Sequence, residues 1–517
     1  MTANTRLWTL RGSAFLAVAL FLTLVAQFWH PVYGLTALIQ LDAPNDDLKI
    51  SAFREQPVYV HRDTGGYDGL YYAQIAYDPT LRSTELPRAM DNFSYRARRI
   101  LPPAAAWLLS AGQPAVIVHV YSFLNVATWL LVAALLWRLL SVTDFRGWLA
   151  WAGVLFSAGA LSSVRLALTD LPMLALLLIA VVAAENARPR TAIAWLASAA
   201  LARETALLGT SALITRPWIS VKNLRTSVLV VAPLFIWLAY IRWQLGPADS
   251  GWANFTLPLA GYAEKIATTL VDLVYLNDAL LAWTTFLALV GLTVQAFYIL
   301  SRWRHLNDAW WRVGAVYTAL MAMIGTAVWE GYPGACTRVL LPLTLAFNLL
   351  AHRSRAALAW LILGNLGVGA GFLVLRDFPV NTHELFAGRS GGVASVIQID
   401  KGWFGAEHAR KHVWSWSSGQ SQLALRTWTD NPVNAQLDFG LRSLAPRTVI
   451  LRSAEKELWR GQVGEKTTRF SVPVRLGPGD TRLEFSTDTP ATRESPNADA
   501  RPLAFALYDP RLSVPNP

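Results

Sequence analysis

Long apolar runs separated by short polar segments dominate the first 375 residues of the chain. One of these runs, 191–215, is interrupted by Arg203 and Glu204, and adjacent charges are costly in the middle of a lipid-facing helix. We therefore expect two short half-spans that turn at this pair, within an α-helical bundle of about eleven membrane spans. The uninterrupted runs of spanning length are 12–30, 115–140, 148–165, 171–187, 226–245, 279–300, 312–329, 338–352 and 356–375.

After Arg376 the pattern changes to short segments in which apolar and polar residues alternate. QLALRTW, TRFSVPVRL and TRLEFST are examples, and turn sequences such as GPGD and TDTP separate such segments. This alternation is typical of half-buried strands. We expect an external all-β sandwich or jelly roll over 395–517, after a membrane-embedded domain over 1–376 that contains a polar external loop over 31–114.

Basic residues predict the orientation of the spans. The first apolar run follows Arg11 and lacks a small-residue cleavage site, so we interpret it as a retained signal anchor. By the positive-inside rule, the connections that gather Lys and Arg lie in the cytoplasm. The N-terminus is then cytoplasmic, and the loop 31–114 and everything after Arg376 are external. The basic residues concerned are Arg138, Arg146, Arg188, Arg190, Arg216, Lys222, Arg225, Arg302, Arg304, Arg312, Arg353 and Arg355.

Composition agrees with a membrane protein and excludes other classes. Hydrophobic residues make up 54% of the chain and charged residues 15%, and 23 Trp cluster near the ends of the apolar runs, as interfacial residues do. The net charge of +11 is dispersed over short loops, so we expect no nucleic-acid partner. A single cysteine, Cys336, excludes an intramolecular disulfide, and the sequence has no Cys/His cluster with zinc spacing.

The segment GYDGLYYAQIAYDP, residues 66–79, places acidic and aromatic residues in the first external loop. Asp68 precedes an aromatic-rich run that ends at a proline, which predicts a short helix with Asp68 as its N-cap. A capping carboxylate keeps one oxygen exposed, so the cap is compatible with Asp68 as our candidate catalytic residue. Tyr67 and Tyr71 beside it are candidate substrate-binding residues, whereas Asp78 fits a turn better.

The same loop continues as DNFSYRARRILPP and brings Arg96, Arg98 and Arg99 to the outer membrane surface. Arginines there oppose the positive-inside rule, so an anion should compensate them. A phosphate fits, because the guanidinium fork matches phosphate oxygens. The alternative is that they contact lipid headgroups or pair with Asp91 and Glu85. Asp91 is itself a candidate substrate-binding residue.

Charged residues further along the chain complete the substrate-binding candidates. Asp170 stands at an external helix junction, where it either helps to line a cavity or caps the following span. Arg203 and Glu204 either pair with one another or reach partners across a cavity. Glu330 and Arg338 bracket the external turn WEGYPGACTR, from which Arg338 could reach a lipid phosphate.

A membrane bundle whose first external loop carries an aspartate, an aromatic-rich short helix and an arginine-containing stretch resembles the GT-C superfamily of glycosyltransferases. YDGLYYAQIAYDP with YRARRILPP is similar to a bacterial branch of it, over residues 10–375. The resemblance implies a polyprenyl-phosphate sugar donor and inverting transfer, with Asp68 as the carboxylate of the loop. The second acidic residue frequent beside that carboxylate is missing, so the metal ligands are unknown and a divalent cation is left open as a cofactor. The C-terminal domain resembles carbohydrate-binding-like modules that some GT-C enzymes append.

We therefore expect an enzyme of the bacterial cytoplasmic membrane that moves a sugar at its outer face to a cell-envelope acceptor. The expected partners are the polyprenyl-phosphate sugar donor, a glycan, lipid or protein acceptor, and membrane lipids. A transporter or flippase of lipid-linked sugar is one alternative, but transporters tend to have midplane sites and repeated halves, which this sequence does not show. A non-catalytic scaffold for envelope assembly is the other alternative.

Overall fold

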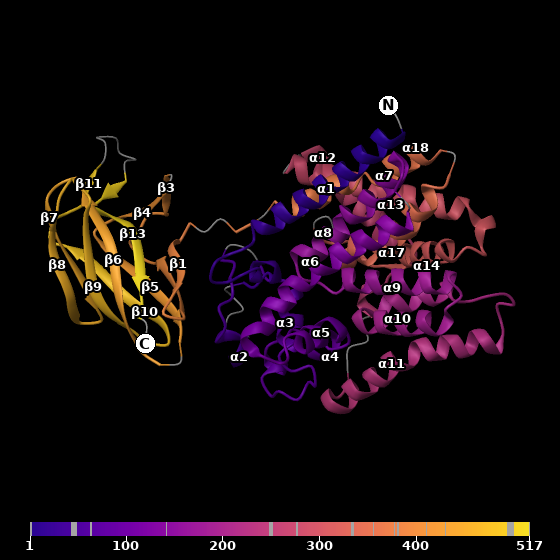
Figure 1. Cartoon of the computed structure of the whole chain (residues 1–517), viewed down its shortest axis with the longest axis horizontal. Coiled ribbons are helices and arrows are strands. Elements are labelled where there is room, and N and C mark those ends of the chain that lie inside the picture. The colour runs from indigo at the N-terminus through magenta and orange to yellow at the C-terminus, as the bar shows by residue number, and fades with distance from the viewer. Residues whose placement is uncertain are drawn as a thin grey trace. The chain divides into compact units, whose positions relative to one another are not determined.

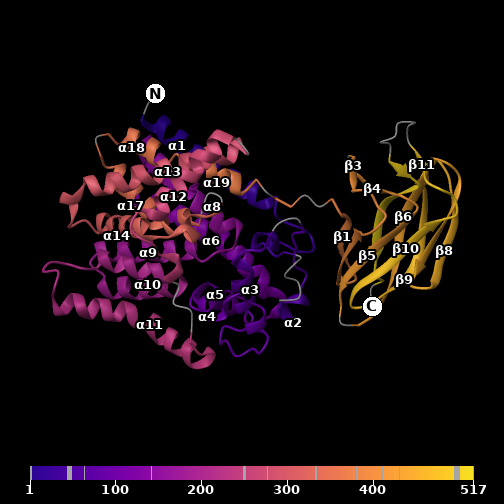
Figure 2. The ribbon, with the colours of Figure 1, turned by 180° about the vertical axis from the view of Figure 1, so that it is seen from behind.

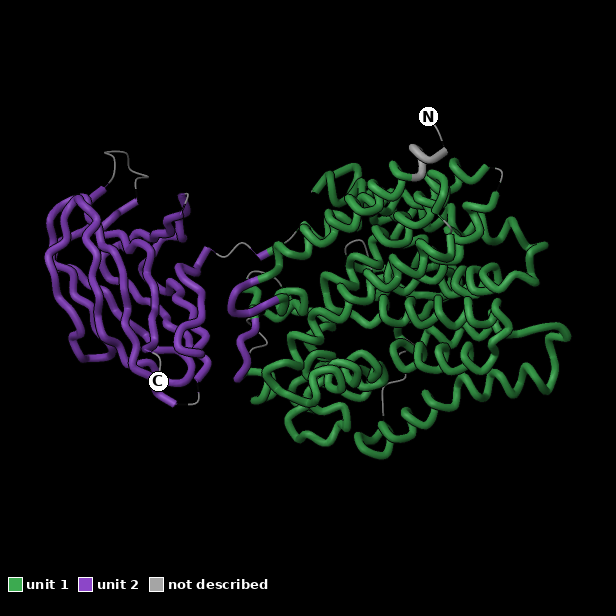
Figure 3. Tube along the Cα trace, viewed as in Figure 1, with its two compact units in different colours: residues 1–29, 35–54, 59–378 green, residues 30–34, 55–58, 379–517 purple. Residues whose placement is uncertain are grey.

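Two compact units make up the chain in the computed structural model (Figure 3). The helical unit contains Met1–Trp29, Leu35–Arg54 and Tyr59–Phe378, and the β unit contains His30–Gly34, Glu55–Val58 and Pro379–Pro517. Arg355, one of the basic residues used to predict the topology, lies outside the described residues. The structure describes residues 3–42, 49–62, 65–140, 142–247, 252–275, 278–331, 335–354, 356–376, 378–379, 382–409, 411–429, 431–493 and 501–515.

The helical unit is built from α-helices and short 3₁₀ helices (Figures 1 and 2). The α-helices are α1 (Ala3–Ala26), α2 (Ser51–Arg54), α3 (Gly69–Ile75), α4 (Phe93–Arg96), α5 (Leu101–Leu109), α6 (Pro114–Leu139), α7 (Phe145–Leu155), α8 (Ala158–Arg165), α9 (Asp170–Glu185), α10 (Pro189–Ala202), α11 (Val221–Leu245), α12 (Ala260–Tyr275), α13 (Ala279–Ser301), α14 (Ala309–Met323), α15 (Thr326–Trp329), α16 (Cys336–Val339), α17 (Leu341–Ala351), α18 (Ala357–Gly364) and α19 (Val368–Val374). The 3₁₀ helices are η1 (Thr36–Ile39), η3 (Leu86–Arg88), η4 (Glu204–Ala212), η5 (Trp252–Asn254) and η6 (Trp303–His305).

Five helices among the described residues are long and apolar enough to cross a membrane. The bent pair α7 and α8, with an angle of 41° between them, adds a sixth if it counts as one span. The protein is therefore mostly helical up to residue 378, with candidate membrane spans. The five are Trp8–Ala26, Pro114–Leu139, Val221–Leu245, Ala279–Ser301 and Ala357–Val374.

Several expected spans fold as helices that are too short to cross a bilayer alone. α9 has 16 residues, which at about 1.5 Å per residue is about 24 Å, less than the roughly 30 Å of a hydrocarbon core. α17 has 11 residues, and the run 312–329 is divided between α14 and α15. Helix length therefore accounts for five or six spans, and the count of about eleven stays a prediction.

The charged pair inside the run 191–215 lies where helix geometry breaks. Arg203 ends α10 and precedes η4 with extended backbone, at φ −160° and ψ 131°. α10 packs between α9 and α11, as both views show (Figures 1 and 2). Arg203 and Glu204 therefore stand at the end of a helix rather than in the middle of one.

The β unit folds as an antiparallel sandwich, as the alternating segments predict. One sheet has the order β1-β2-β5-β10-β7-β8, another has the order β3-β4-β13-β6-β9, and β11 pairs with β12. The strands are β1 (Glu384–Ser390), β2 (Val393–Ile399), β3 (Glu407–Ala409), β4 (His412–Ser417), β5 (Gln420–Trp428), β6 (Val433–Ser443), β7 (Arg447–Ser453), β8 (Lys456–Val463), β9 (Thr468–Leu476), β10 (Gly479–Thr487), β11 (Thr492–Arg493), β12 (Pro502–Leu503) and β13 (Phe505–Ser513).

The core of the sandwich lies between the two large sheets. Leu423 and Leu425 of β5 meet Phe439 of β6 and Phe505 of β13 in one cluster of buried side chains. Buried and partly exposed residues alternate along β5, which is the signal that made the strand predictable. The first strand, β1, has no such alternation, so the boundary predicted from the sequence, at 395, came after this strand.

Candidate functional site

A cavity of about 550 Å³ in the helical unit gathers most of the candidate residues. Its polar wall comes from the first loop, from the end of α10 and from α16, and its apolar wall comes from η5, α14 and α15. Five arginines and three carboxylates line it, so the lining carries an excess of positive charge. The sequence candidates in the lining are Tyr67, Asp68, Asp91, Arg96, Arg98, Arg99, Arg203, Glu204 and Arg338.

Asp68 occupies the N-cap position of α3, as the sequence predicts, but its side chain makes no capping hydrogen bond. Its Oδ2 lies 2.8 Å from Nη1 of Arg96, and the side chain is 26% exposed. Asp78, by contrast, accepts hydrogen bonds from the backbone of Arg82 and Ser83, as a turn residue does. Asp68 is thus the acid of this segment whose carboxylate faces the cavity.

Gly69 allows Asp68 to reach the cavity. A Cβ atom at this position would lie 2.3 Å from the carbonyl oxygen of Leu166 and 3.0 Å from that of Ile39. Backbone carbonyls cannot move aside as the end of a flexible side chain can, so α3 begins this close to α8 and η1 only with glycine here. Packing therefore requires Gly69, the second glycine of the segment GYDGLYY, and the sequence alone did not predict this role.

Arg96 is held by two carboxylates. Its Nε and Nη2 donate to Asp91 at 3.0 and 2.7 Å, while Nη1 faces Asp68. Its guanidinium carbon lies 4.9 Å from the centre of the Tyr71 ring. Partial burial acts to raise the pKa of Asp91, but the hydrogen bonds and charge of Arg96 outweigh it, and the pKa lies below its ordinary value. The expected alternative of pairing is therefore realised for Asp91, whereas Glu85 accepts from Ser51 instead.

Arg99 is buried in a network of its own. Its Nη1 donates to the Tyr72 hydroxyl at 2.6 Å, its Nη2 donates to Tyr95 at 3.1 Å, and its Nε donates to Glu204 at 3.3 Å. Burial raises the pKa of Tyr72, so this phenol stays neutral and accepts the hydrogen bond of the arginine. Glu204 therefore pairs with an arginine of the first loop rather than with its neighbour Arg203.

Asp170 lies behind the cavity wall. It is fully buried as the first residue of α9, so it neither caps the helix nor lines the cavity, which corrects both sequence interpretations. Its Oδ1 lies 2.6 Å from Nη1 of Arg203, and its Oδ2 lies 3.6 Å from Nη1 of Arg338. Arg338 also donates from Nη2 to the Tyr67 hydroxyl at 2.7 Å. One carboxylate thus holds two arginines that do line the cavity.

Glu330 was predicted as a substrate-binding residue but lies outside the lining of the cavity, whereas Tyr95 lines the cavity and was not predicted. Glu330 is exposed and does not contribute to the cavity. Tyr95 does contribute, and the guanidinium carbons of Arg96, Arg98 and Arg99 lie 5.6, 5.2 and 5.2 Å from the centre of its ring. An aromatic residue next to three arginines was the available signal.

Asn254 and Phe255 also line the cavity without having been predicted. Asn254 donates to the Tyr95 hydroxyl at 3.4 Å, and Phe255 is 45% exposed at the apolar wall. They belong to the connection before α12, which has no motif, so the sequence offered no signal for them.

The candidate divalent cation finds no ready site among the described residues. They contain no group of three His, Cys, Asp or Glu side chains close enough to hold a metal ion. The three carboxylates of the cavity each lie within 3.3 Å of an arginine nitrogen. Since the guanidiniums already compensate these carboxylates, we assign no metal ligand.

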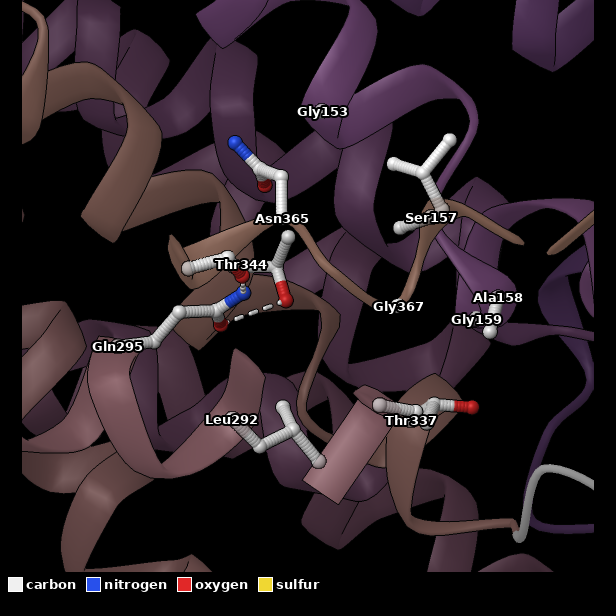
Figure 4. Close-up of a pocket in the computed structure, with 13 residues that line it drawn as sticks. Gly153, Ser157, Ala158, Gly159, Leu292, Gln295, Thr337, Thr344, Asn365 and Gly367 are labelled. Atoms are coloured by element: carbon white, nitrogen blue, oxygen red, sulfur yellow. Dashed lines mark hydrogen bonds between the residues drawn. The ribbon is translucent and has the colours of Figure 1, made fainter. Parts of the chain in front are cut away.

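A second pocket, of about 30 Å³, lies among the helices and has no charged residue in its lining (Figure 4). Thr344 donates to Gln295 at 3.0 Å, and Gln295 donates to the carbonyl of Gly364 at 2.7 Å. Space of this size suits one or two water molecules. This pocket is therefore a feature of helix packing and not a candidate substrate site.

Comparison with known proteins gives weak likenesses. No family model matches the chain, and no curated protein matches it. A variant of a family 29 carbohydrate binding module, complexed with cellulohexaose, matches 26% of this chain and 90% of its own at 9% identity and a TM-score of 0.17. A family 29 module matches 24% of this chain and 90% of its own at 8% identity and a TM-score of 0.15. Likenesses this weak establish neither a ligand nor an activity.

Proposed function

We propose that the protein is a GT-C-type membrane glycosyltransferase that moves a sugar, with inversion, from a polyprenyl-phosphate donor to a cell-envelope acceptor. The observation that carries the proposal is that Asp68 lines the same cavity of about 550 Å³ as five arginines. A carboxylate suits an acceptor hydroxyl, and guanidiniums suit a phosphate. The acceptor is a glycan, a lipid or a protein.

The two walls of the cavity fit the two parts of a lipid-linked donor. The arginines lie on the polar wall, while Phe255, Leu320, Ile324 and Val328 form an apolar wall. A sugar phosphate carries charge and hydroxyl groups, whereas a polyprenyl chain is entirely apolar. A site for such a donor therefore needs both kinds of surface within reach of one another.

The proposed reaction is a single displacement at the anomeric carbon. The acceptor oxygen forms a bond to this carbon while the bond from the carbon to the phosphate oxygen breaks. The bonding electrons leave with the phosphate, whose charge the arginines stabilise, and the acceptor proton passes to Asp68. Arg96 keeps the Asp68 carboxylate in place through its contact of 2.8 Å.

The proposal places the site at the outer face of the bacterial cytoplasmic membrane. The N-terminus would be cytoplasmic, and the β sandwich would lie outside with the first loop, because the basic connections segregate under this orientation. The helices that are long enough to span a membrane support the membrane location.

Substitution of Asp68 tests the proposal. We expect Asp68→Asn to lower sugar transfer by about 10²–10⁴-fold, because asparagine cannot take the proton. Mass spectrometry of the lipids that a deletion strain accumulates identifies the polyprenyl-phosphate sugar. Transfer is then measured with the purified protein and this donor. Asp144→Asn is the matched control. Asp144 caps α7 and does not line the cavity, and asparagine caps comparably.

Two outcomes would contradict the proposal. Activity of Asp68→Asn above about a tenth of wild type would exclude a base role at this position. A deletion strain with unchanged envelope glycans and no accumulated polyprenyl-phosphate sugar would exclude glycosyl transfer altogether, and would leave a scaffold or a transporter.

A further inference from the structure

The arginines of the cavity differ in how far other side chains already occupy their donor groups. Arg96 directs Nε and Nη2 to Asp91 and Nη1 to Asp68. Arg99 directs its three nitrogens to Tyr72, Tyr95 and Glu204. A guanidinium has five N–H donors in a fixed plane, and in both Arg96 and Arg99 all three nitrogens already have an oxygen atom of the protein as partner.

Arg203 and Arg338 direct fewer nitrogens to oxygen atoms of the described residues, one for Arg203 and two for Arg338, whose Nη2 donates to the Tyr67 hydroxyl. They share one carboxylate, Asp170, through contacts of 2.6 and 3.6 Å from one nitrogen of each. Neither oxygen of Asp170 forms a well-aligned hydrogen bond with a described residue, and the same holds for Nε of Arg203. Both arginine side chains are nearly buried, with exposed fractions of 11% and 7%, yet both line the cavity.

Charge separates the two groups as well. Asp170 with Arg203 and Arg338 carries one net positive charge, whereas Arg96 with Asp68 and Asp91 carries one net negative charge. Arg98, which also lines the cavity and shares the Tyr95 ring with Arg96, brings the charge of the second group to zero, so the net positive charge lies with Arg203 and Arg338. An anion therefore gains most beside Arg203 and Arg338, two nearly buried guanidiniums with spare donors.

We propose that Arg203 and Arg338, positioned by the buried Asp170, bind the phosphate of the donor, while Arg96 positions Asp68. The inference rests on the proposed function for the identity of the donor. It assigns different side chains of the cavity to the two reaction partners, with the leaving phosphate at Arg203 and Arg338 and the acceptor hydroxyl at Asp68. Asp170 acts through the two arginines and does not touch the donor.

Binding measurements with the full-length protein in lipid nanodiscs test this division. The two probes are a polyprenyl monophosphate and inorganic phosphate. We expect Arg203→Lys and Arg338→Lys each to weaken the binding of both probes by about tenfold, because lysine keeps the charge but loses the planar fork. We expect Arg96→Lys to stay within about twofold of wild type, as should Arg138→Lys, whose side chain is exposed at the end of α6.

Kinetics provide a second readout that a general loss of structure would not give. Arg203→Lys and Arg338→Lys should raise the KM for the donor, whereas Arg96→Lys should lower kcat with an unchanged donor KM. If Arg96→Lys weakens phosphate binding as much as the other two, or if Arg203→Lys and Arg338→Lys bind both probes like wild type, the assignment is wrong. A loss confined to the polyprenyl probe also contradicts it, because recognition would then involve the lipid chain.

The inference and the proposed function fail separately. If the wild type binds both probes through Arg203 and Arg338 but transfers no sugar, the phosphate site stands and glycosyl transfer is excluded. If the wild type transfers sugar but Arg203→Lys and Arg338→Lys leave the binding of both probes unchanged, glycosyl transfer stands and the division of the cavity is excluded. A wild type that binds neither probe overturns the inference directly.

Discussion

At the scale of the residue, burial decides which charges pair. Asp170 has no exposed surface, so its carboxylate is stable only beside the guanidiniums of Arg203 and Arg338. The reverse also holds, because each of these arginines is nearly buried and needs a negative charge nearby. A buried pair of this kind adds little net stability compared with apolar packing, but removing one partner is costly.

Asp170→Asn should therefore destabilise the protein. The substitution keeps the size of the side chain and leaves two buried guanidiniums without their carboxylate, which costs about 3–5 kcal/mol where one partner of a buried pair is removed. Thermal unfolding in detergent should show a midpoint clearly below that of wild type, while Asp144→Asn stays close to it. Equal midpoints for the two variants would show that Asp170 does not stabilise the arginines.

At the scale of the element, the position of α3 depends on one residue without a side chain. The start of this helix carries Asp68, and Gly69 allows it to approach the carbonyl oxygen of Leu166. A short helix has few contacts of its own, so its neighbours fix its position. Moving it by an ångström would move the carboxylate relative to the arginines.

Gly69→Ala tests this dependence. The added Cβ would lie 2.3 Å from a backbone oxygen, so α3 must shift, and overpacking of this kind costs about 1–3 kcal/mol. We expect kcat to fall by about tenfold or more, since a misplacement near 1 Å can cost up to about 100-fold. Gly369→Ala in α19 is the control, because a Cβ there meets nothing within 4 Å. A Gly69→Ala protein as active and stable as this control would contradict the role of close packing.

Local elements were predictable where the sequence carries a local signal. The short helix after Asp68 follows from an N-cap residue and a terminating proline, and the strands follow from alternation such as that of β5. The breaks between α7 and α8 and between α14 and α15 were not predictable, because an apolar run has the same composition whether its helix is continuous or bent.

The partners of the site residues could not be predicted from the sequence. Arg99 pairs with Glu204, which is 105 positions away, and Arg338 with Tyr67, which is 271 positions away. Spacing along the chain has no bearing on such pairs, which form only when the helices pack. The sequence therefore yielded every charged residue in the lining of the cavity, but neither their pairing nor the burial of Asp170.

At the scale of the whole molecule, the distribution of basic residues predicts a cytoplasmic N-terminus and an external β sandwich. An alkaline phosphatase fused after residue 390 should be active, because this enzyme folds only outside the cytoplasm, and a reporter active only in the cytoplasm should be silent there. The opposite pattern would reverse the orientation and place the cavity and the sandwich on the other side of the membrane.

Tyr67 and Asp68 are consecutive in the chain but contact different arginines, with Arg338 bound to Tyr67 and Arg96 facing Asp68. A single peptide bond therefore connects the residue that Arg338 contacts with the residue that Arg96 contacts. A donor that draws Arg338 toward its phosphate would displace Tyr67 and, with it, the carboxylate that meets the acceptor. By thermodynamic linkage, the acceptor must alter the affinity for the donor by the same factor as the donor alters that for the acceptor. The two substrates should accordingly bind with cooperativity, whose size reports the stiffness of this one connection.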